Sequence, residues 1–307
     1  MIQKILVPLD GSGFGEDTLP YAATLARHAQ LDIEVAHVHV PHPPDHLLAN
    51  TQYQYEGVDL AEYDLADRTE EQAYLAGVVA KLGDTSGREV RAVILDGLVA
   101  DAIDVYTRST EPGLILMGTH GRTGFSRAWL GSVADALVRQ APWPVLLVRP
   151  SCGGCGDPVA PFNHVLIPLD GSERSERIVA PTMDLVAGSE TRVRLLQVVR
   201  PSAVFGTQVL PVSAGAVAEA RRKAIQYLEG VAEGIADRVS AVGIEVIEST
   251  QPAQGILEVA ERESVDLVAL ATHGYRGVRR ALLGSVADKV LRGADVPLLL
   301  LGPGVQN

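Results

Sequence analysis

An internal repeat constrains the fold of this chain more than any other feature of its sequence. Residues 4–12, which end in Val-Pro-Leu-Asp-Gly-Ser, return after 160 residues as 164–172, which end in Ile-Pro-Leu-Asp-Gly-Ser. Residues 118–121 (Gly-Thr-His-Gly) return after 153 residues as 271–274 (Ala-Thr-His-Gly), and nine residues later both copies continue with Gly-Ser. A chain of 307 residues has room for about two domains. The repeat therefore predicts two copies of one folding unit.

Each copy alternates short apolar runs with segments whose apolar residues have helical spacing. In the first copy we expect strands at 4–10, 33–40, 89–95, 114–117 and 145–148, and helices at 16–30, 60–82, 100–108 and up to residue 140. Short alternating units imply parallel strands, right-handed crossovers and helices on both faces of the sheet. An aromatic content of only 5% fits such a sheet, whose core is aliphatic. The predicted class is α/β, with a doubly wound, Rossmann-like sheet of five parallel strands in each domain.

The second copy follows the same order. We expect its strands at 164–170, 192–199, 244–248, 265–270 and 297–301, and its helices at 175–187, 215–239, 255–263 and 286–292. Residues 151–160 are small, polar and rich in glycine, which predicts a linker between domain 1 (1–150) and domain 2 (161–307). The fall in offset from 160 to 153 means that the second copy lost seven residues. We place most of this loss in the loop after its second strand, at 201–211 against 41–57.

Charge and hydropathy exclude several classes of protein. The net charge of -12 argues against a nucleic-acid partner, which needs a basic face, and against an anionic membrane surface. No apolar run approaches the roughly 18 residues that span a bilayer. The N-terminal apolar segment is too short for a signal peptide, and its pattern is that of a strand. Two cysteines in the whole chain fit a reducing compartment, so we expect a cytoplasmic protein.

The strongest candidate site is the glycine loop between the fourth strand and the next helix. Gly118, Gly121 and Gly131 have the spacing G-x2-G-x9-G, and Ser132 follows at the start of a helix. Backbone N–H groups at a helix N-terminus bind phosphate, and glycine lets a ligand approach the main chain. The alternative is that these glycines only turn the chain after a strand. The strand–loop–helix context and the recurrence favour the phosphate interpretation.

The second copy of the loop has Gly274, Gly284 and Ser285 at matching positions, but Ala271 replaces the first glycine. We expect the extra methyl group of Ala271 to resist a positive φ and to crowd a ligand. We therefore expect the first loop to be the better binding site. The second site remains a candidate.

Two further pairs of residues lie where parallel strands end, the edge at which open α/β sheets bind ligands. Asp10 and Asp170 end the first strands, where a carboxylate can accept hydrogen bonds from ribose hydroxyls; a turn-forming role is the compatible alternative. Val38 and Val198 lie at the ends of the second strands, where their main chain could face an adenine ring. From the sequence alone, a core role is favoured for both valines.

Other chemically interesting residues form no complete catalytic or metal-binding set. His120 and His273 lie beside the loops without a paired nucleophile, and Cys152 and Cys155 lie in the linker without a second cysteine pair. A disulfide or a metal shared between protomers is the minority interpretation of these cysteines. Most of the arginines within the loops are expected to be solvated, although some could reach phosphates; they are Arg122, Arg127, Arg276, Arg279 and Arg280.

These motifs together resemble the universal stress protein family. Residues 7–12, 118–124, 131–134 and 144–148 are similar to its opening strand, its nucleotide loop with the helix that follows, and its closing strand. The resemblance covers nearly the whole chain, twice. It implies a strand order of 3-2-1-4-5 in each domain and a pseudo-dimer within the chain, formed by the closing strands at 145–148 and 298–301. A homodimer of whole chains is a further option.

The resemblance also implies a function. The family has members that bind ATP, and the G-x2-G-x9-G-Ser pattern marks that branch. It implies that Asp10 contacts the nucleoside, that the backbone of Val38 contacts adenine, and that Gly118, Gly121, Gly131 and Ser132 contact the phosphates, with Mg as a candidate companion ion. Asp170, Val198, Gly274, Gly284 and Ser285 match these positions in the second copy.

We therefore expect a cytoplasmic, nucleotide-dependent stress-response protein with at most slow hydrolysis. The alternatives are a scaffold of the same fold that binds no nucleotide, and an adenylate-forming or nucleotide-hydrolysing enzyme. The last of these would need a base and a second substrate site, and the sequence indicates neither.

Overall fold

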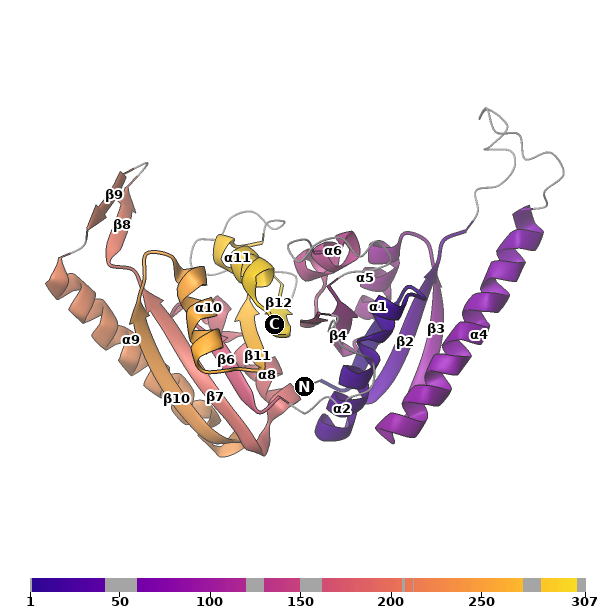
Figure 1. The fold of residues 1–307 in the computed structure, drawn as a ribbon, viewed down its shortest axis with the longest axis horizontal. Helices are drawn as coiled ribbons and strands as arrows, with labels where there is room; N and C mark the ends of the chain where they lie inside the picture. Colours follow the sequence, from indigo (N-terminus) through magenta and orange to yellow (C-terminus); the bar gives the residue numbers. More distant parts are fainter. Residues whose placement is uncertain are drawn as a thin grey trace.

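The computed structural model describes residues 2–41, 60–119, 130–149, 162–205, 208–211, 213–272 and 283–302 (Figure 1). In the first half the elements are β1 (Lys4–Leu9), α1 (Gly13–Glu16), α2 (Leu19–Ala29), β2 (Asp32–His39), α4 (Leu60–Ser86), β3 (Val90–Asp96), α5 (Val99–Thr110), β4 (Gly113–Gly118), α6 (Ser132–Gln140) and β5 (Val145–Val148).

The second half repeats this order and also contains the hairpin β8–β9 and a 3-10 helix, which have no counterpart among the described elements of the first half. Its elements are β6 (His164–Pro168), α7 (Glu173–Glu176), α8 (Val179–Val186), β7 (Gly188–Val199), β8 (Ser202–Phe205), β9 (Gln208–Pro211), α9 (Ala214–Ile235), the 3-10 helix η1 (Ala236–Arg238), β10 (Val239–Glu248), α10 (Pro252–Arg262), β11 (Leu267–Ala271), α11 (Ser285–Gly293) and β12 (Leu298–Leu301).

The two halves share one ten-stranded sheet in the order β10-β7-β6-β11-β12-β5-β4-β1-β2-β3. Read from the outer edge toward the centre, each half has the order 3-2-1-4-5, and its five strands in this sheet are parallel. At the centre β12 runs antiparallel to β5, with Leu299 opposite Leu146. The predicted α/β class, strand order and pairing of the closing strands are confirmed.

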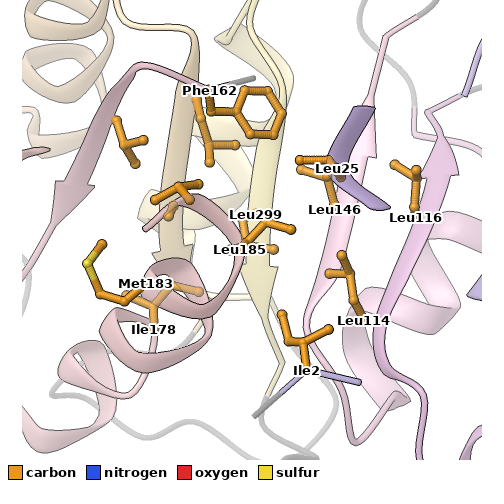
Figure 2. Close-up of a cluster of buried hydrophobic side chains, with 14 of the residues drawn as sticks. Ile2, Leu25, Leu114, Leu116, Leu146, Phe162, Ile178, Met183, Leu185 and Leu299 are labelled. Carbon is orange, nitrogen blue, oxygen red and sulfur yellow. The ribbon is translucent and has the colours of Figure 1, made fainter. Parts of the chain in front are cut away.

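Alternation along the strands builds two apolar layers, one on each face of the sheet. Ile5 and Val7 of β1 point into the layer under α2, α4, α8 and α9, whereas Leu6 points into the layer under α5, α6, α10 and α11. Period-2 alternation with apolar residues on both faces is what a buried parallel strand requires. Figure 2 shows that both halves share the first layer, with Leu146 on β5 close to Leu299 on β12.

Strand register locates the residues that the second copy lost. Lys4 lies opposite Asp32 in the first half and His164 lies opposite Arg192 in the second, so the offset of 160 persists through the second strands. Ile33 pairs with Val90, whereas Val193 pairs with Val242, so the offset has already fallen before the third strands. The shortening therefore lies between the second and third strands, as predicted.

Several predicted segments differ from the observed elements. The helix expected at 175–187 is two helices, α7 and α8, and the strand expected at 192–199 already begins at Gly188. The helix expected at 16–30 is two helices, because Ser12 caps the short α1 and a new helix begins at Leu19 with Pro20 in its first turn. The segment 201–211, expected to be a loop, contains the antiparallel hairpin β8–β9. The helix expected to reach 239 ends at Ile235, and β10 starts at Val239 instead of 244, because β7 is long enough to pair with these extra residues.

Candidate functional site

Asp10 follows β1 directly and is fixed in a turn by its own neighbours. Its Oδ1 accepts a hydrogen bond from the Ser12 N–H at 3.0 Å and another from the Ser12 hydroxyl at 2.5 Å. The Ser12 Oγ in turn accepts from the Gly15 N–H at 3.2 Å and so caps α1. Gly11 has φ 76°, the left-handed conformation that favours glycine. The carboxylate is therefore held at the carboxyl edge of the sheet, and the turn-forming role is real.

The second half reproduces this turn. Asp170 Oδ1 accepts from the Ser172 N–H at 3.0 Å and from the Ser172 hydroxyl at 2.6 Å. The Ser175 N–H donates to the Ser172 Oγ at 3.1 Å, and Gly171 has φ 81°. The two aspartates thus have the same local geometry, although Asp170 is exposed and Asp10 is half-buried.

In each half a backbone hydrogen bond joins the residue before the glycine loop to the residue after it. The Gly131 N–H donates to the Thr119 carbonyl at 2.8 Å, and the Gly284 N–H donates to the Thr272 carbonyl at 2.8 Å. A Cβ added at Gly131 would lie 3.3 Å from the Thr119 oxygen, which is a tight contact. The G-x9-G part of the pattern therefore has a structural reason: its last glycine lets the helix start approach the end of the strand.

The start of α6 presents backbone N–H groups at this edge. Gly131 is the N-cap and has no side chain to bond them, and Ser132 at the first helical position is exposed. Asp135 lies in the first turn, but Arg139 pairs with it through two contacts of 2.8 and 2.9 Å. α11 begins in the same way after Gly284, with Ser285 exposed and Asp288 bound to Arg292 at 3.0 and 3.1 Å. The helix dipole at both starts favours an anion.

The expectation about Ala271 was wrong in one respect. Gly118 is the last residue of β4 and pairs with Val148, and Ala271 is the last residue of β11 and pairs with Leu301. Both therefore have extended backbone, and neither position requires the positive φ that alanine would resist. The methyl group of Ala271 remains an added volume at the edge of the second site.

Val38 and Val198 lie near the ends of β2 and β7, as predicted. The Val38 side chain is buried in the layer that contains Ile115 and Met117, and Val198 packs partly against the same layer. Their side chains therefore act as core, in agreement with the interpretation favoured from the sequence. A contact of either main chain with a base stays a prediction.

Several predicted residues lie outside the described parts of the chain. The sequence assigned loop, linker or ligand roles to them, and these roles stay predictions; the residues are Gly121, Gly274, His120, His273, Arg122, Arg127, Arg276, Arg279, Arg280, Cys152 and Cys155, with the linker 151–160.

The sequence analysis missed a buried histidine network in the first half. His39 is 1% exposed, and its two ring nitrogens contact two carboxylates, Nδ1 with Glu71 Oε2 at 3.0 Å and Nε2 with Asp64 Oδ1 at 2.9 Å. His37 Nδ1 donates to the Leu9 carbonyl at 2.8 Å, directly before Asp10. The sequence pattern could have indicated this network. His37 and His39 are two apart on a strand and share a face, and Asp64 and Glu71 are seven apart on a helix and lie on one side of it.

A tyrosine on the long helix accompanies each aspartate turn. In the second half the Tyr227 hydroxyl donates to Glu176 Oε2 at 3.1 Å. In the first half the buried Tyr74 hydroxyl has no hydrogen-bond partner among the described residues, and its ring lies edge-on to His37. Burial, with the nearby charges of Glu16 and Asp10, raises the pKa of Tyr74 to about 12. Tyr74 is therefore a neutral hydroxyl beside the aspartate turn at ordinary pH.

The described residues contain neither a metal-binding cluster nor a membrane-spanning helix. Within 2–41, 60–119 and the other described ranges, no three His, Cys, Asp or Glu side chains form a group that could hold a metal ion. In the same part of the chain no helix has the length and apolar character that a membrane crossing requires.

Comparison with known proteins identifies relatives of the whole repeat. A universal stress protein of Mycobacterium tuberculosis is 30% identical over 193 residues, which span 62% of this chain and 62% of that protein, less than two thirds of its length. A universal stress protein of Synechocystis is 24% identical, with 97% of this chain and 99% of that protein covered.

The fold has a solved counterpart as well. The crystal structure of a universal stress protein from Archaeoglobus fulgidus superposes with a TM-score of 0.69 at 19% identity, over 98% of both chains. At that identity the likeness shows the fold alone.

The family model described as "Universal stress protein family" matches residues 1–149 and again residues 161–302. These two matches account for nearly all of the chain and repeat the same architecture in each half. The chain therefore belongs to the universal stress protein family, with two family domains in tandem.

Proposed function

We propose that the chain binds ATP at the carboxyl edge of its sheet, in a site of the first half (site 1) and a matching site of the second half (site 2). One observation carries the proposal. In both halves a glycine N–H ties the loop end to the threonine after the fourth strand, at 2.8 Å, and the start of a nine-residue helix follows beside the aspartate turn. A phosphate-binding helix start beside a fixed carboxylate suits a phosphorylated nucleoside.

Each residue then has a defined task. The N–H groups of Ser132 and Ser285 face the phosphates. The glycines let the phosphates approach the main chain, with the N–H groups of Gly131 and Gly284 bound to the threonine carbonyls; these glycines are Gly118, Gly121, Gly131, Gly274 and Gly284. Asp10 and Asp170 accept hydrogen bonds from the ribose hydroxyls, and the main chains of Val38 and Val198 face the base. Mg would neutralise the phosphates when bound with the nucleotide. No residue is assigned as a general base, so the proposed role is binding with at most slow hydrolysis.

Cellular function follows from nucleotide occupancy in this proposal. The chain acts in the cytoplasm as a stress-response protein whose state depends on bound adenine nucleotide. The support is the family membership together with the two helix starts described above.

The test adds charge where the phosphates would bind. Ser132→Glu and Ser285→Glu place a carboxylate in the first turn of α6 and α11, where it favours the helix by about 0.3–1 kcal/mol but repels phosphate. We expect each single variant to lose one bound ATP per chain in calorimetry, and the double variant to lose both, with no loss of thermal stability.

Gln140→Glu is the matched control. It adds the same charge at the exposed last residue of α6, away from the site, and should leave ATP binding unchanged. Native mass spectrometry of the purified wild type identifies any nucleotide that is carried along. Full ATP binding by the double variant contradicts the proposed site, and absence of binding by the wild type favours the scaffold function.

A further inference from the structure

Three positions at the carboxyl edge of the sheet differ in chemistry between the two halves. They are the second residue of the short helix after the first strand, the residue after the second strand, and the N-cap of the helix after the third strand. The first half has Phe14, Val40 and Leu98 there, and the second half has Arg174, Arg200 and Gln251; we name these sets rim 1 and rim 2.

Their equivalence is fixed by the repeat. The offset of 160 applies to the first two positions, because it holds from the first strand through the second. The third position is the N-cap of α5 in one half and of α10 in the other. The strands that precede these positions, β1, β2 and β3, are direct neighbours in the sheet, and so are β6, β7 and β10.

Rim 1 is apolar and faces solvent. The exposed fractions are 42% for Phe14, 58% for Val40 and 73% for Leu98. A single exposed apolar side chain is ordinary. Here three of them follow three adjacent strands, and neighbouring strands lie about 5 Å apart, so the three form an apolar region at one edge of the sheet. Outside residues 202–211, every large apolar side chain that is strongly exposed in the described part of the chain belongs to the first half; the other three are Tyr63, Leu65 and Val105.

Rim 2 carries a cation at two of the three places and the neutral Gln251 at the third. Arg174 and Arg200 are exposed, and neither has a hydrogen bond or ion pair with its side chain among the described residues. Residues 13–17 contain two carboxylates and no cation, whereas 173–177 contain two carboxylates and two arginines. A guanidinium group binds phosphate through paired N–H donors, and an exposed one without a protein partner can do so without losing an ion pair.

The rims lie on the nucleoside side of the two sites, an assignment that rests on the proposed function. There the phosphates occupy the helix starts after the fourth strands, and the ribose lies at Asp10 or Asp170. The rims follow the first, second and third strands, so they surround the ribose and base. Rim 1 offers apolar surface to a base, and rim 2 offers cations to a group that ordinary ATP lacks.

We propose that the two sites bind different classes of nucleotide. Site 2 takes an adenine nucleotide that carries a second phosphate on the ribose, separated from the 5′-phosphates, and Arg174 and Arg200 bind that second phosphate. Site 1 takes a nucleotide whose phosphates are all at the 5′ position. The second copy has thus diverged in specificity while keeping the aspartate turn and the helix start.

The experiment compares AMP with adenosine 3′,5′-bisphosphate, which differ only in the second phosphate, by calorimetry on the full chain. Ser132→Glu leaves site 2 to be measured, and Ser285→Glu leaves site 1. We expect site 2 to prefer the bisphosphate by about tenfold or more, as charge-assisted hydrogen bonds imply, and site 1 to show no such preference.

Exchanging the rims completes the test. In the Ser132→Glu background, Arg174→Phe with Arg200→Val should abolish the preference. In the Ser285→Glu background, Phe14→Arg with Val40→Arg should create it. Arg192→Val is the control, because it removes an exposed arginine near the amino-terminal end of β7, at the opposite edge of the sheet.

The outcomes separate this inference from the function beneath it. ATP binding without a preference at site 2, or a preference that survives the loss of both arginines, overturns the inference and leaves the proposed function intact. Failure of ATP, AMP and the bisphosphate to bind wild type overturns both.

Discussion

Gly11 and its counterpart Gly171 set the shape of the aspartate turn. Their φ angles of 76° and 81° lie in the left-handed region, where a Cβ meets the following carbonyl oxygen. We predict that Gly11→Ala lowers the free energy of unfolding by about 1–2 kcal/mol, because alanine is strained there. Denaturant unfolding measures the change. Gly13→Ala is the control, since it meets nothing within 4 Å at a negative φ, and an equal loss in both variants would contradict the explanation.

Some residues at the site were readable from the sequence and others were not. The turn at Asp10 and the helix start at Gly131 and Ser132 were predictable because turn and helix-start chemistry is local, and the repeat presented each of them twice; their contacts with a ligand stay predictions. The φ at Ala271 was predicted wrongly, because the position belongs to the strand rather than to the loop after it. The partners of His39 were not predictable, because Asp64 and Glu71 lie more than 20 residues away and reach it only through packing.

The buried His39 links two elements, β2 and α4. A neutral imidazole has one N–H donor, yet both ring nitrogens contact carboxylates, so the full set of hydrogen bonds needs the imidazolium form. Burial lowers the pKa of His39, but the hydrogen bonds to Asp64 and Glu71 outweigh it and the net pKa is raised above 6.5. Arg68, which pairs with Asp64 and with Asp96 on β3, works against the rise.

This link predicts a pH dependence with a defined sign. Because the folded pKa is raised, the stabilisation is fully present below about 6.5 and is lost as pH rises through the folded pKa. We predict that His39→Gln destabilises the chain by about 2 kcal/mol at pH 6 and by less at pH 9. Unfolding curves of both proteins at the two pH values measure the gap.

His28→Gln controls for the loss of a histidine, since His28 is exposed on α2 and has no carboxylate partner among the described residues. If the difference in unfolding free energy between wild type and His39→Gln stays constant or increases toward pH 9, the proposed role of the protonated His39 is wrong. The second half lacks the pair, with Gln197 and Val199 in these positions, so the dependence should originate in the first half alone.

Helices and strands were predicted well where the apolar periodicity of the segment determines its structure, and poorly where pairing with another strand determines it. The strands of both halves followed from apolar runs between turns. The early start of β10 and the hairpin β8–β9 did not, because their partners, and not their own sequence, make them strands.

The whole molecule is organised around the antiparallel pair β5–β12, which joins the two five-stranded halves of the sheet and leaves β3 and β10 as its outer edges. The pair is not symmetric at its ends. Arg149, after β5, donates to the Leu291 and Arg292 carbonyls at 3.0 and 3.3 Å, at the C-terminal end of α11. A cation there is favoured by the helix dipole. The matching residue after β12 is Gly302, which lies against the C-terminal end of α6.

Gly302 is therefore the residue that lets the two halves close. A Cβ at this position would lie 2.6 Å from the Val138 carbonyl oxygen, a main-chain atom that cannot turn away. We predict that Gly302→Ala lowers the free energy of unfolding by about 1–3 kcal/mol through this overpacking. Gly215→Ala in α9 is the control, because it meets nothing within 4 Å and should gain up to about 1 kcal/mol. Thermal unfolding of the full chain distinguishes them: equal stability of Gly302→Ala and wild type would mean that the halves do not need this close approach. A loss confined to Gly302→Ala would show that the two halves need this close approach of β12 to α6.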